Sequence, residues 1–231
     1  MPKINKDSTL NITFVGIGLC LLCSAIISFI AIQLRSVQEN NVVLDMQKKI
    51  VSSAGLDEVY GSVENAMSNI KTLIIDLDRG EIADINPDTY ELSKELREDG
   101  KYKFLSAEED VASIKKREKY SKVYIEYKDN EINTLILPVR GYGLWGILYG
   151  YLAIEGDFNT VAGLEFYEHK ETPGLGAEID NPKWKALWKG KKIYRENGEV
   201  SLKVIKGSVM KTSDNFSYEI DGLSGATLTC N

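Results

Sequence analysis

The apolar positions divide the chain into one long uncharged run near the N-terminus and a much longer segment with mixed patterns. No residue between Asp7 and Arg35 is charged, and residues 8–34 read STLNITFVGIGLCLLCSAIISFIAIQL. About 20 apolar residues suffice for a helix to cross a bilayer. A signal peptide is the alternative, but its apolar core is usually shorter and ends at a small-residue cleavage site. The following RSVQENN lacks such a site, so the pattern favours an uncleaved membrane anchor.

The charges that flank this run indicate its orientation. Lys3 and Lys6 precede the run, and Arg35 follows it directly. The positive-inside rule mildly favours a cytoplasmic N-terminus, which places the rest of the chain outside the cytoplasm. We therefore expect an N-terminal tail and transmembrane helix in residues 1–35 and an extracytoplasmic domain in residues 36–231.

The patterns beyond the anchor predict a domain of the α+β class. Val43, Met46, Ile50 and Ala54 recur at helical spacing and predict a juxtamembrane helix that ends near Gly55. Periodicity and turn residues then predict a hairpin over 71–85, a helix over 87–99, a second hairpin over 121–139 that turns at Asp129–Asn130, a central strand within 143–154, a short helix over 181–188 and a third hairpin over 191–206 that turns at Asn197–Gly198. With no internal repeat or low-complexity linker, these elements form one mixed α+β domain.

Composition narrows the classes of function. The chain has 231 residues, 43% of them hydrophobic, which is enough for a sizeable core. Its formal net charge is −6, with acidic residues along the whole length and no long basic patch, which argues against nucleic acid as a partner. His169 is the only histidine, which removes most metal sites and catalytic triads from consideration.

The three cysteines limit the covalent chemistry of the chain. Cys20 and Cys23 lie inside the apolar run and share a helix face, where packing against another helix is a more common role than metal or redox chemistry. Only Cys230 lies outside the run. The extracytoplasmic part therefore has no internal disulfide, and its stability must come from packing.

Three glycine-bearing stretches are candidates for a ligand site, and TPGLG at residues 172–176 is the first. Glycine permits positive φ and lets a ligand approach the main chain, where successive N–H groups can bind an anion. An ordinary loop with a type II turn is the alternative. The spacing does not match the dinucleotide-binding fingerprint or the P-loop.

The second stretch, RGYGLWG at 140–146, pairs Gly141 and Gly143 with Leu144 and Trp145. A planar side chain next to flexible backbone can form the wall of a pocket for a planar ligand, and a strand entrance with a buried tryptophan is the alternative. In the third stretch, DGLSGAT at 221–227, Gly225 and Ala226 expose the backbone beside Thr227.

A threonine hydroxyl is a weak nucleophile without a base, and no histidine is available to act as one. Thr227 is therefore better explained as a residue that another protein recognises within the loop and modifies. Asp221 is placed to help position a metal–phosphate donor in that reaction.

These motifs resemble those of a known family. DGLSGAT resembles the flavinylation motif D-x-x-[S/T]-G-A-T, and ETPGLG resembles the glycine turn of the same FMN-binding domain family. The anchor, LRSVQENN, PVRGYGLWG, ETPGLGAEIDNPKW and DGLSGATLT, in that order, make nearly the whole chain similar to the C subunit of the sodium-translocating NADH:quinone reductase. The G subunit of the Rnf-type ferredoxin:NAD oxidoreductase shares both motifs. Family members usually continue past the motif with a further helical segment, so the domain is a candidate for truncation at its C-terminus.

The resemblance implies a site and a cofactor. Thr227 would carry FMN through a phosphoester bond, in preference to Ser224 and to Thr229, which shares a face with Thr227 if the segment is extended there. A flavin transferase that uses FAD and magnesium would read the loop formed by Asp221, Ser224, Gly225 and Ala226. The flavin would be lined by Thr172, Gly174, Leu175 and Gly176, with Leu144 and Trp145 close by. No catalytic or metal-ligating residue is expected.

The implied function is electron transfer within a membrane complex. The FMN would pass electrons from an iron–sulfur centre to another flavin while the complex oxidises NADH, reduces ubiquinone and exports sodium. The chain would be a single-pass protein of the inner membrane, in contact with lipid and with other subunits, and would have no active site of its own. A non-redox extracytoplasmic sensor or scaffold is the alternative from another class, although a sensor has no need of the flavinylation motif.

Overall fold

The computed structural model describes residues 8–230, and the chain forms two compact units, Met1–Asp45 and Met46–Asn231. The first unit is mostly the N-terminal part of helix α1 (Thr9–Ser53), which is long and apolar enough to cross a membrane. The predicted membrane helix is confirmed in the described residues. The juxtamembrane helix is not a separate element, because α1 continues to Ser53 and Gly55, at φ 65°, follows its end.

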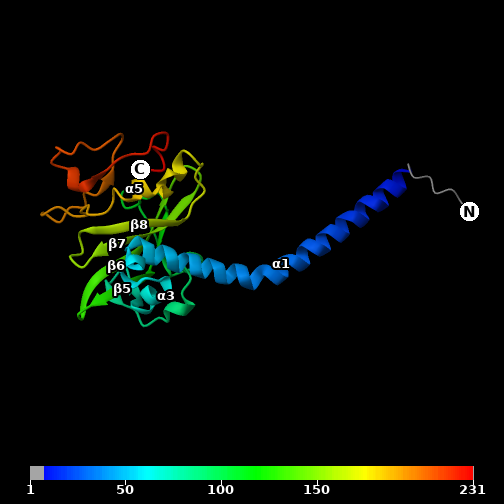
Figure 1. Ribbon diagram of the computed structural model, residues 1–231, viewed down its shortest axis with the longest axis horizontal. Coiled ribbons are helices and arrows are strands. Elements are labelled where there is room, and N and C mark those ends of the chain that lie inside the picture. The colour runs from blue at the N-terminus through cyan, green and yellow to red at the C-terminus, as the bar shows by residue number, and fades with distance from the viewer. Residues whose placement is uncertain (1–7, 231) are drawn as a thin grey trace, which may run out of the picture. The chain divides into compact units, whose positions relative to one another are not determined.

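The second unit is built on one antiparallel sheet (Figure 1). Its strand order is β2-β1-β5-β6-β7-β8. The bounds are β1 (Ile70–Asp76), β2 (Glu81–Ile82), β5 (Tyr120–Lys128), β6 (Glu131–Tyr142), β7 (Ile147–Glu155) and β8 (Val161–Glu168). The hairpin predicted over 71–85 is β1–β2, and the one over 121–139 is β5–β6, with Asp129 and Asn130 at positive φ in its turn. The predicted central strand is β7, which pairs on both sides.

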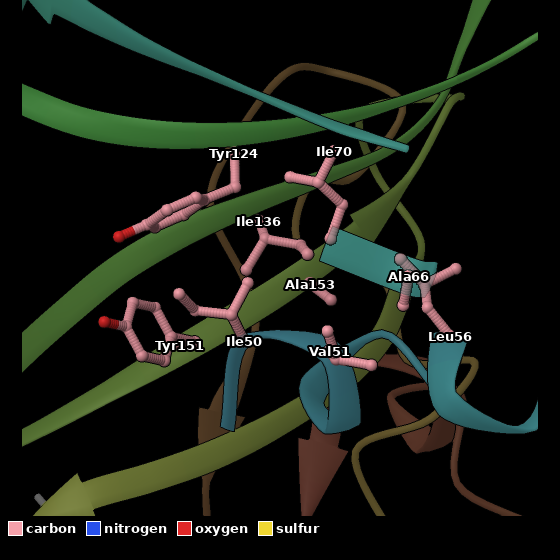
Figure 2. Packing of buried hydrophobic residues seen from close by; sticks show 9 residues of the cluster. All are labelled: Ile50, Val51, Leu56, Ala66, Ile70, Tyr124, Ile136, Tyr151 and Ala153. Carbon is pink, nitrogen blue, oxygen red and sulfur yellow. The ribbon is translucent and has the colours of Figure 1, made fainter. Parts of the chain in front are cut away.

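One face of the sheet packs against short helices (Figure 2). The end of α1, α2 (Leu56–Tyr60) and α3 (Val63–Ser68) bring apolar side chains onto β1, β5, β6 and β7. Figure 2 shows this cluster, which consists of Ile50, Val51, Leu56, Ala66, Ile70, Tyr124, Ile136, Tyr151 and Ala153. Full burial of each large side chain in such a core stabilises the fold by about 1.5–3 kcal/mol.

A second core lies on the opposite face of the sheet. The side chains of β7 contribute to both cores, because successive residues of a strand point to opposite faces. Leu148 of β7 and Leu164 of β8 pack with three residues from the C-terminal segment, Ile179, Trp184 and Ile220. That segment contains η2 (Gly176–Asp180), α5 (Pro182–Lys185), β9 (Lys203–Val204), η3 (Phe216–Tyr218) and β10 (Glu219–Ile220). The short helix predicted over 181–188 is thus confirmed as α5, capped by the Asn181 side chain.

The helix predicted over 87–99 is wrong as one continuous element. The segment contains only η1 (Pro87–Thr89) and α4 (Leu92–Glu95), and β3 (Tyr102–Phe104) and β4 (Lys116–Glu118) follow as a small separate ladder. Tyr90 lies between the two short helices in an extended conformation. Its hydroxyl donates to the Tyr120 carbonyl at 2.7 Å. This tertiary hydrogen bond holds Tyr90 out of helical geometry.

The third predicted hairpin keeps its turn but not its strands. Gly198 has φ 79°, and the Arg195 N–H donates to the Glu199 carbonyl. Beyond the turn the pairing is limited to one isolated bridge, between Tyr194 and Val200. The following strand β9 pairs in parallel with β10 instead, because Leu202 and Val204 turn toward the second core.

Candidate functional site

The three glycine-bearing stretches meet at one buried carboxylate. Glu171 is 6% exposed and directly precedes TPGLG. Its Oε1 accepts a hydrogen bond from the Trp145 N–H at 2.9 Å, and its Oε2 accepts one from the Thr229 hydroxyl at 2.6 Å. A single side chain therefore connects the β6–β7 turn, the segment after β8 and the C-terminal loop. Sequence reasoning did not identify Glu171, since nothing local shows that this acid is buried.

Two of the predicted glycines make room for this carboxylate. A Cβ on Gly143 would lie 2.7 Å from Glu171 Oε1. A Cβ on Gly176 would overlap the same carboxylate and would lie 2.8 Å from the Thr229 hydroxyl oxygen. Gly174 differs, because its φ is 77° and the space around a Cβ there is open. Gly176 is thus required by packing within the protein, and Gly174 by backbone conformation.

The C-terminal loop is anchored where it leaves β10. The Asp221 carbonyl accepts a hydrogen bond from Trp184 Nε1 at 2.7 Å, and Asp221 Oδ1 accepts one from the Val209 N–H at 2.7 Å. The next residue, Gly222, passes so close to the Ile205 carbonyl that a Cβ would overlap it. Asp221 therefore fixes the start of the motif, with one carboxylate oxygen already engaged.

The far end of the loop is fixed as well, and Thr227 is left exposed between the two ends. Ala226 is buried, and its carbonyl accepts hydrogen bonds from the Thr229 and Cys230 N–H groups at 3.1 Å. Thr229 is 9% exposed, and its hydroxyl donates a hydrogen bond to Glu171. The segment turns rather than extends, so the condition under which Thr229 shares the face of Thr227 is not met.

Large apolar side chains around this loop are exposed to solvent. Leu144, Trp145, Leu175 and Leu228 are 48%, 63%, 46% and 58% exposed. A Cβ on Gly225, which has φ 75°, would lie 2.9 Å from Leu175 Cδ2, so TPGLG borders the C-terminal loop. The alternative of a buried Trp145 is wrong. Exposed apolar groups beside a free hydroxyl suit a planar ligand with a polar tail.

The only histidine is already engaged near the site. The Glu171 N–H donates to His169 Nδ1 at 3.2 Å, so His169 Nε2 carries the proton and lies 2.8 Å from Asp180 Oδ2. In this arrangement His169 orients the turn and has no free nitrogen to act as a base. Within residues 8–230, moreover, no cluster of three metal-ligating side chains occurs.

These features define a class of protein. Strands β7 and β8, the glycine turn and the exposed threonine loop lie within residues 143–231, which match the FMN-binding domain family. The chain belongs to the NqrC family, the C subunits of the Na(+)-translocating NADH-quinone reductase. It is accordingly an electron-transfer flavoprotein subunit of an oxidoreductase complex, with one apolar N-terminal helix typical of a single-pass inner-membrane protein.

The individual comparisons support this assignment. The C subunit of the Pseudomonas aeruginosa reductase is 46% identical over 230 residues, which cover 97% of this chain and 88% of that protein. The corresponding protein of Vibrio alginolyticus is 40% identical over 98% of this chain and 88% of its own. The crystal structure of Shewanella oneidensis NqrC superposes with a TM-score of 0.68 at 29% identity, over 80% of this chain and 84% of that one. These relatives favour an NqrC-type protein over the Rnf-type one and over the sensor.

Proposed function

We propose that this chain carries FMN on Thr227 through a phosphoester bond and that the flavin relays electrons between an iron–sulfur centre and another flavin of the complex. One observation carries the choice of residue. Thr227 is exposed within DGLSGAT, whereas the Thr229 hydroxyl is buried and donates to Glu171. Ser224, also exposed, precedes Gly225 and is better suited to shaping the turn.

The attachment requires a partner, because this chain supplies no base. In the proposed transfer the Thr227 oxygen attacks the flavin-side phosphorus of FAD, the bond between the two phosphates breaks, and AMP leaves. The hydroxyl proton passes to a base of the flavin transferase, since His169 is engaged with Glu171 and Asp180. Magnesium bound with FAD would neutralise the developing charge on the phosphates.

The residues around Thr227 then hold the cofactor in place. Asp221 fixes one end of the loop and Ala226 the other, so Ser224, Gly225 and Thr227 are presented to the transferase in one conformation. Leu144, Trp145 and Leu175 would offer apolar contact to the ring system, and the exposed Thr172 and Gly174 would border it. FMN supplies the reversible redox chemistry, while its surroundings set its potential.

The location follows from the anchor. Helix α1 would lie in the inner membrane in contact with lipid, and the charges before it favour a domain on the extracytoplasmic side. A covalent link keeps the flavin from being lost there. Other subunits would approach the exposed apolar side chains around the loop and complete the sodium-coupled electron path to quinone.

The test is intact-mass analysis of the full chain produced with and without a flavin transferase. The unaltered chain should gain the mass of FMN less one water only when the transferase is present. Thr227→Ala should abolish this gain. Thr229→Val removes the rival hydroxyl at nearly constant volume and should retain the gain in the folded chain, while the melting temperature falls because Glu171 Oε2 loses its donor. A gain that persists in Thr227→Ala would overturn the assignment.

A further inference from the structure

One segment of the chain is richer in basic residues than the rest. Residues 183–211 contain nine lysines and arginines but only two acidic residues. The whole chain contains 28 basic and 34 acidic residues, so the chain outside this segment contains 19 basic and 32 acidic residues. An acidic protein thus carries a strongly positive segment, and such a segment attracts anions to its surface.

This segment forms much of the wall of a cavity of about 350 Å³. The cavity lies between the chain that follows α5, the residues around η3, and β10. Its lining consists of Ala186, Leu187, Lys189, Gly190, Lys191, Val209, Lys211, Phe216, Ser217, Glu219, Ile220 and Asp221. Small-molecule sites typically have volumes of about 300–1,000 Å³, so the cavity has the size of a small ligand.

Lys191 is buried without a direct ion pair, and the carboxylates of Asp221 and Glu219 act on its charge only from a greater distance. Lys191 is 9% exposed, and its ammonium donates to the Phe216 carbonyl at 2.6 Å and lies 3.9 Å from the centre of the Phe216 ring. Within residues 8–230 it forms no ion pair with a carboxylate. Burial holds the pKa of Lys191 below its ordinary value, because the ammonium has lost water. A bound anion would compensate this charge.

The other charges of the wall leave an excess of positive charge. Lys189 and Lys211 are exposed, and neither forms an ion pair within the described part of the chain. Of the two acids in the wall, Glu219 pairs with Lys203 at 3.4 Å, and Asp221 Oδ1 accepts from the Val209 N–H. Three lysines therefore line the cavity against two carboxylates, and one of these, Glu219, is paired with a fourth lysine, Lys203.

The wall also includes apolar surface. Leu187 is 38% exposed and Phe216 is 39% exposed, and both line the cavity beside Val209. We propose that this cavity is a binding site for a phosphate ester whose organic part lies on Leu187 and Phe216 while Lys189, Lys191 and Lys211 hold the phosphate. A nucleotide and an anionic phospholipid headgroup share this chemistry. The proposal does not depend on FMN at Thr227.

The occupant would also contact the start of the threonine loop. Ile220 ends β10, and Asp221 begins the motif, and both line the cavity. Binding would therefore stabilise the strand and the hydrogen bonds that hold the first residue of DGLSGAT.

The first test is calorimetric titration of the full chain in a neutral detergent with AMP, and with adenosine as the uncharged control. AMP should bind with one site per chain, and adenosine at least tenfold more weakly. Lys189→Gln and Lys211→Gln should each weaken AMP binding about tenfold, because each removes one charge-assisted hydrogen bond. Both lysines are exposed, so folding should be unaffected. Lys128→Gln, an exposed lysine of β5 outside the cavity, is the matched control and should bind like the unaltered chain.

The second arm identifies the source of the phosphate. Short-chain phosphatidylglycerol is added to the same titration, with phosphatidylcholine as its control. Displacement of AMP by phosphatidylglycerol alone supports a lipid headgroup, and AMP binding that neither lipid displaces supports a soluble phosphate ester. The proposal is overturned if neither AMP nor phosphatidylglycerol binds, or if the Lys189→Gln/Lys211→Gln double variant binds either one as the unaltered chain does.

Discussion

Replacing Glu171 tests whether one buried carboxylate holds the three loops of the flavin site together. Glu171→Ala leaves the Trp145 N–H and the Thr229 hydroxyl without their acceptor. A buried donor that loses its partner costs about 1–3 kcal/mol, and the partly buried Trp145 N–H should lie at the low end of that range. Together the two losses should lower the free energy of unfolding by about 3 kcal/mol. In a domain of this size the melting temperature should fall by about 6–12 °C.

Glu171→Gln separates hydrogen bonding from charge. The amide oxygen can still accept from the Trp145 N–H, and the Thr229 hydroxyl can rotate to accept from the amide nitrogen. We expect a loss of about 1 kcal/mol, as for a typical neutral hydrogen bond that replaces a charge-assisted one. Glu168→Ala, an exposed glutamate at the end of β8, is the control and should change stability little.

The assay is thermal and urea unfolding of the full chain in detergent, followed by intact-mass measurement of FMN incorporation. We expect Glu171→Ala to lose both stability and incorporation, and Glu171→Gln to keep most of each. A Glu171→Ala chain that melts within about 2 °C of the unaltered one and incorporates FMN normally would refute the role of this carboxylate.

Three further predictions use other parts of the structure. Gly143→Ala should reduce FMN incorporation, because its Cβ would lie 2.7 Å from a buried carboxylate oxygen, whereas Gly146→Ala in the same turn meets only a lysine side chain at 3.4 Å and should not. Burial raises the pKa of the Cys230 thiol, so peptide mapping after iodoacetamide treatment at about pH 7.5 should show slower alkylation there than at a free cysteine. The hydrogen bond to Glu126 raises the pKa of Tyr60, so its stabilising effect is present below about pH 10 and is lost as pH rises through the higher folded-state pKa. Tyr60→Phe should therefore lower the urea midpoint at about pH 8 and show a smaller fall between about pH 9 and 11 than the unaltered chain.

Sequence patterns predicted the secondary-structure elements that are determined by residues close to one another in the chain. The β5–β6 hairpin follows from alternating side chains and from two residues that accept positive φ, Asp129 and Asn130. The helix over 87–99 failed because the decisive contact lies 30 residues away, between Tyr90 and Tyr120. The third hairpin failed because its second strand pairs with β10 rather than with its neighbour in sequence.

The candidate site was predictable in its parts but not in its connections. The motifs located the three loops, and the structure brings them together. Sequence alone did not reveal that Glu171 is the side chain they share, or that the hydroxyl of Thr229 is already engaged there. Nor did it reveal the cavity with its three lysines, since their spacing of 2 and 20 residues has no recognisable pattern.

The decisive observation is the position of FMN in the unaltered chain. Fragmentation mass spectrometry of the peptide that contains residues 221–230, taken from protein produced with a flavin transferase, locates the modified side chain. We expect FMN on Thr227, with Ser224 and Thr229 unmodified, because Thr227 is exposed in the loop and the Thr229 hydroxyl donates to Glu171. FMN on Ser224 or Thr229, or a peptide that carries no FMN under these conditions, would contradict this expectation.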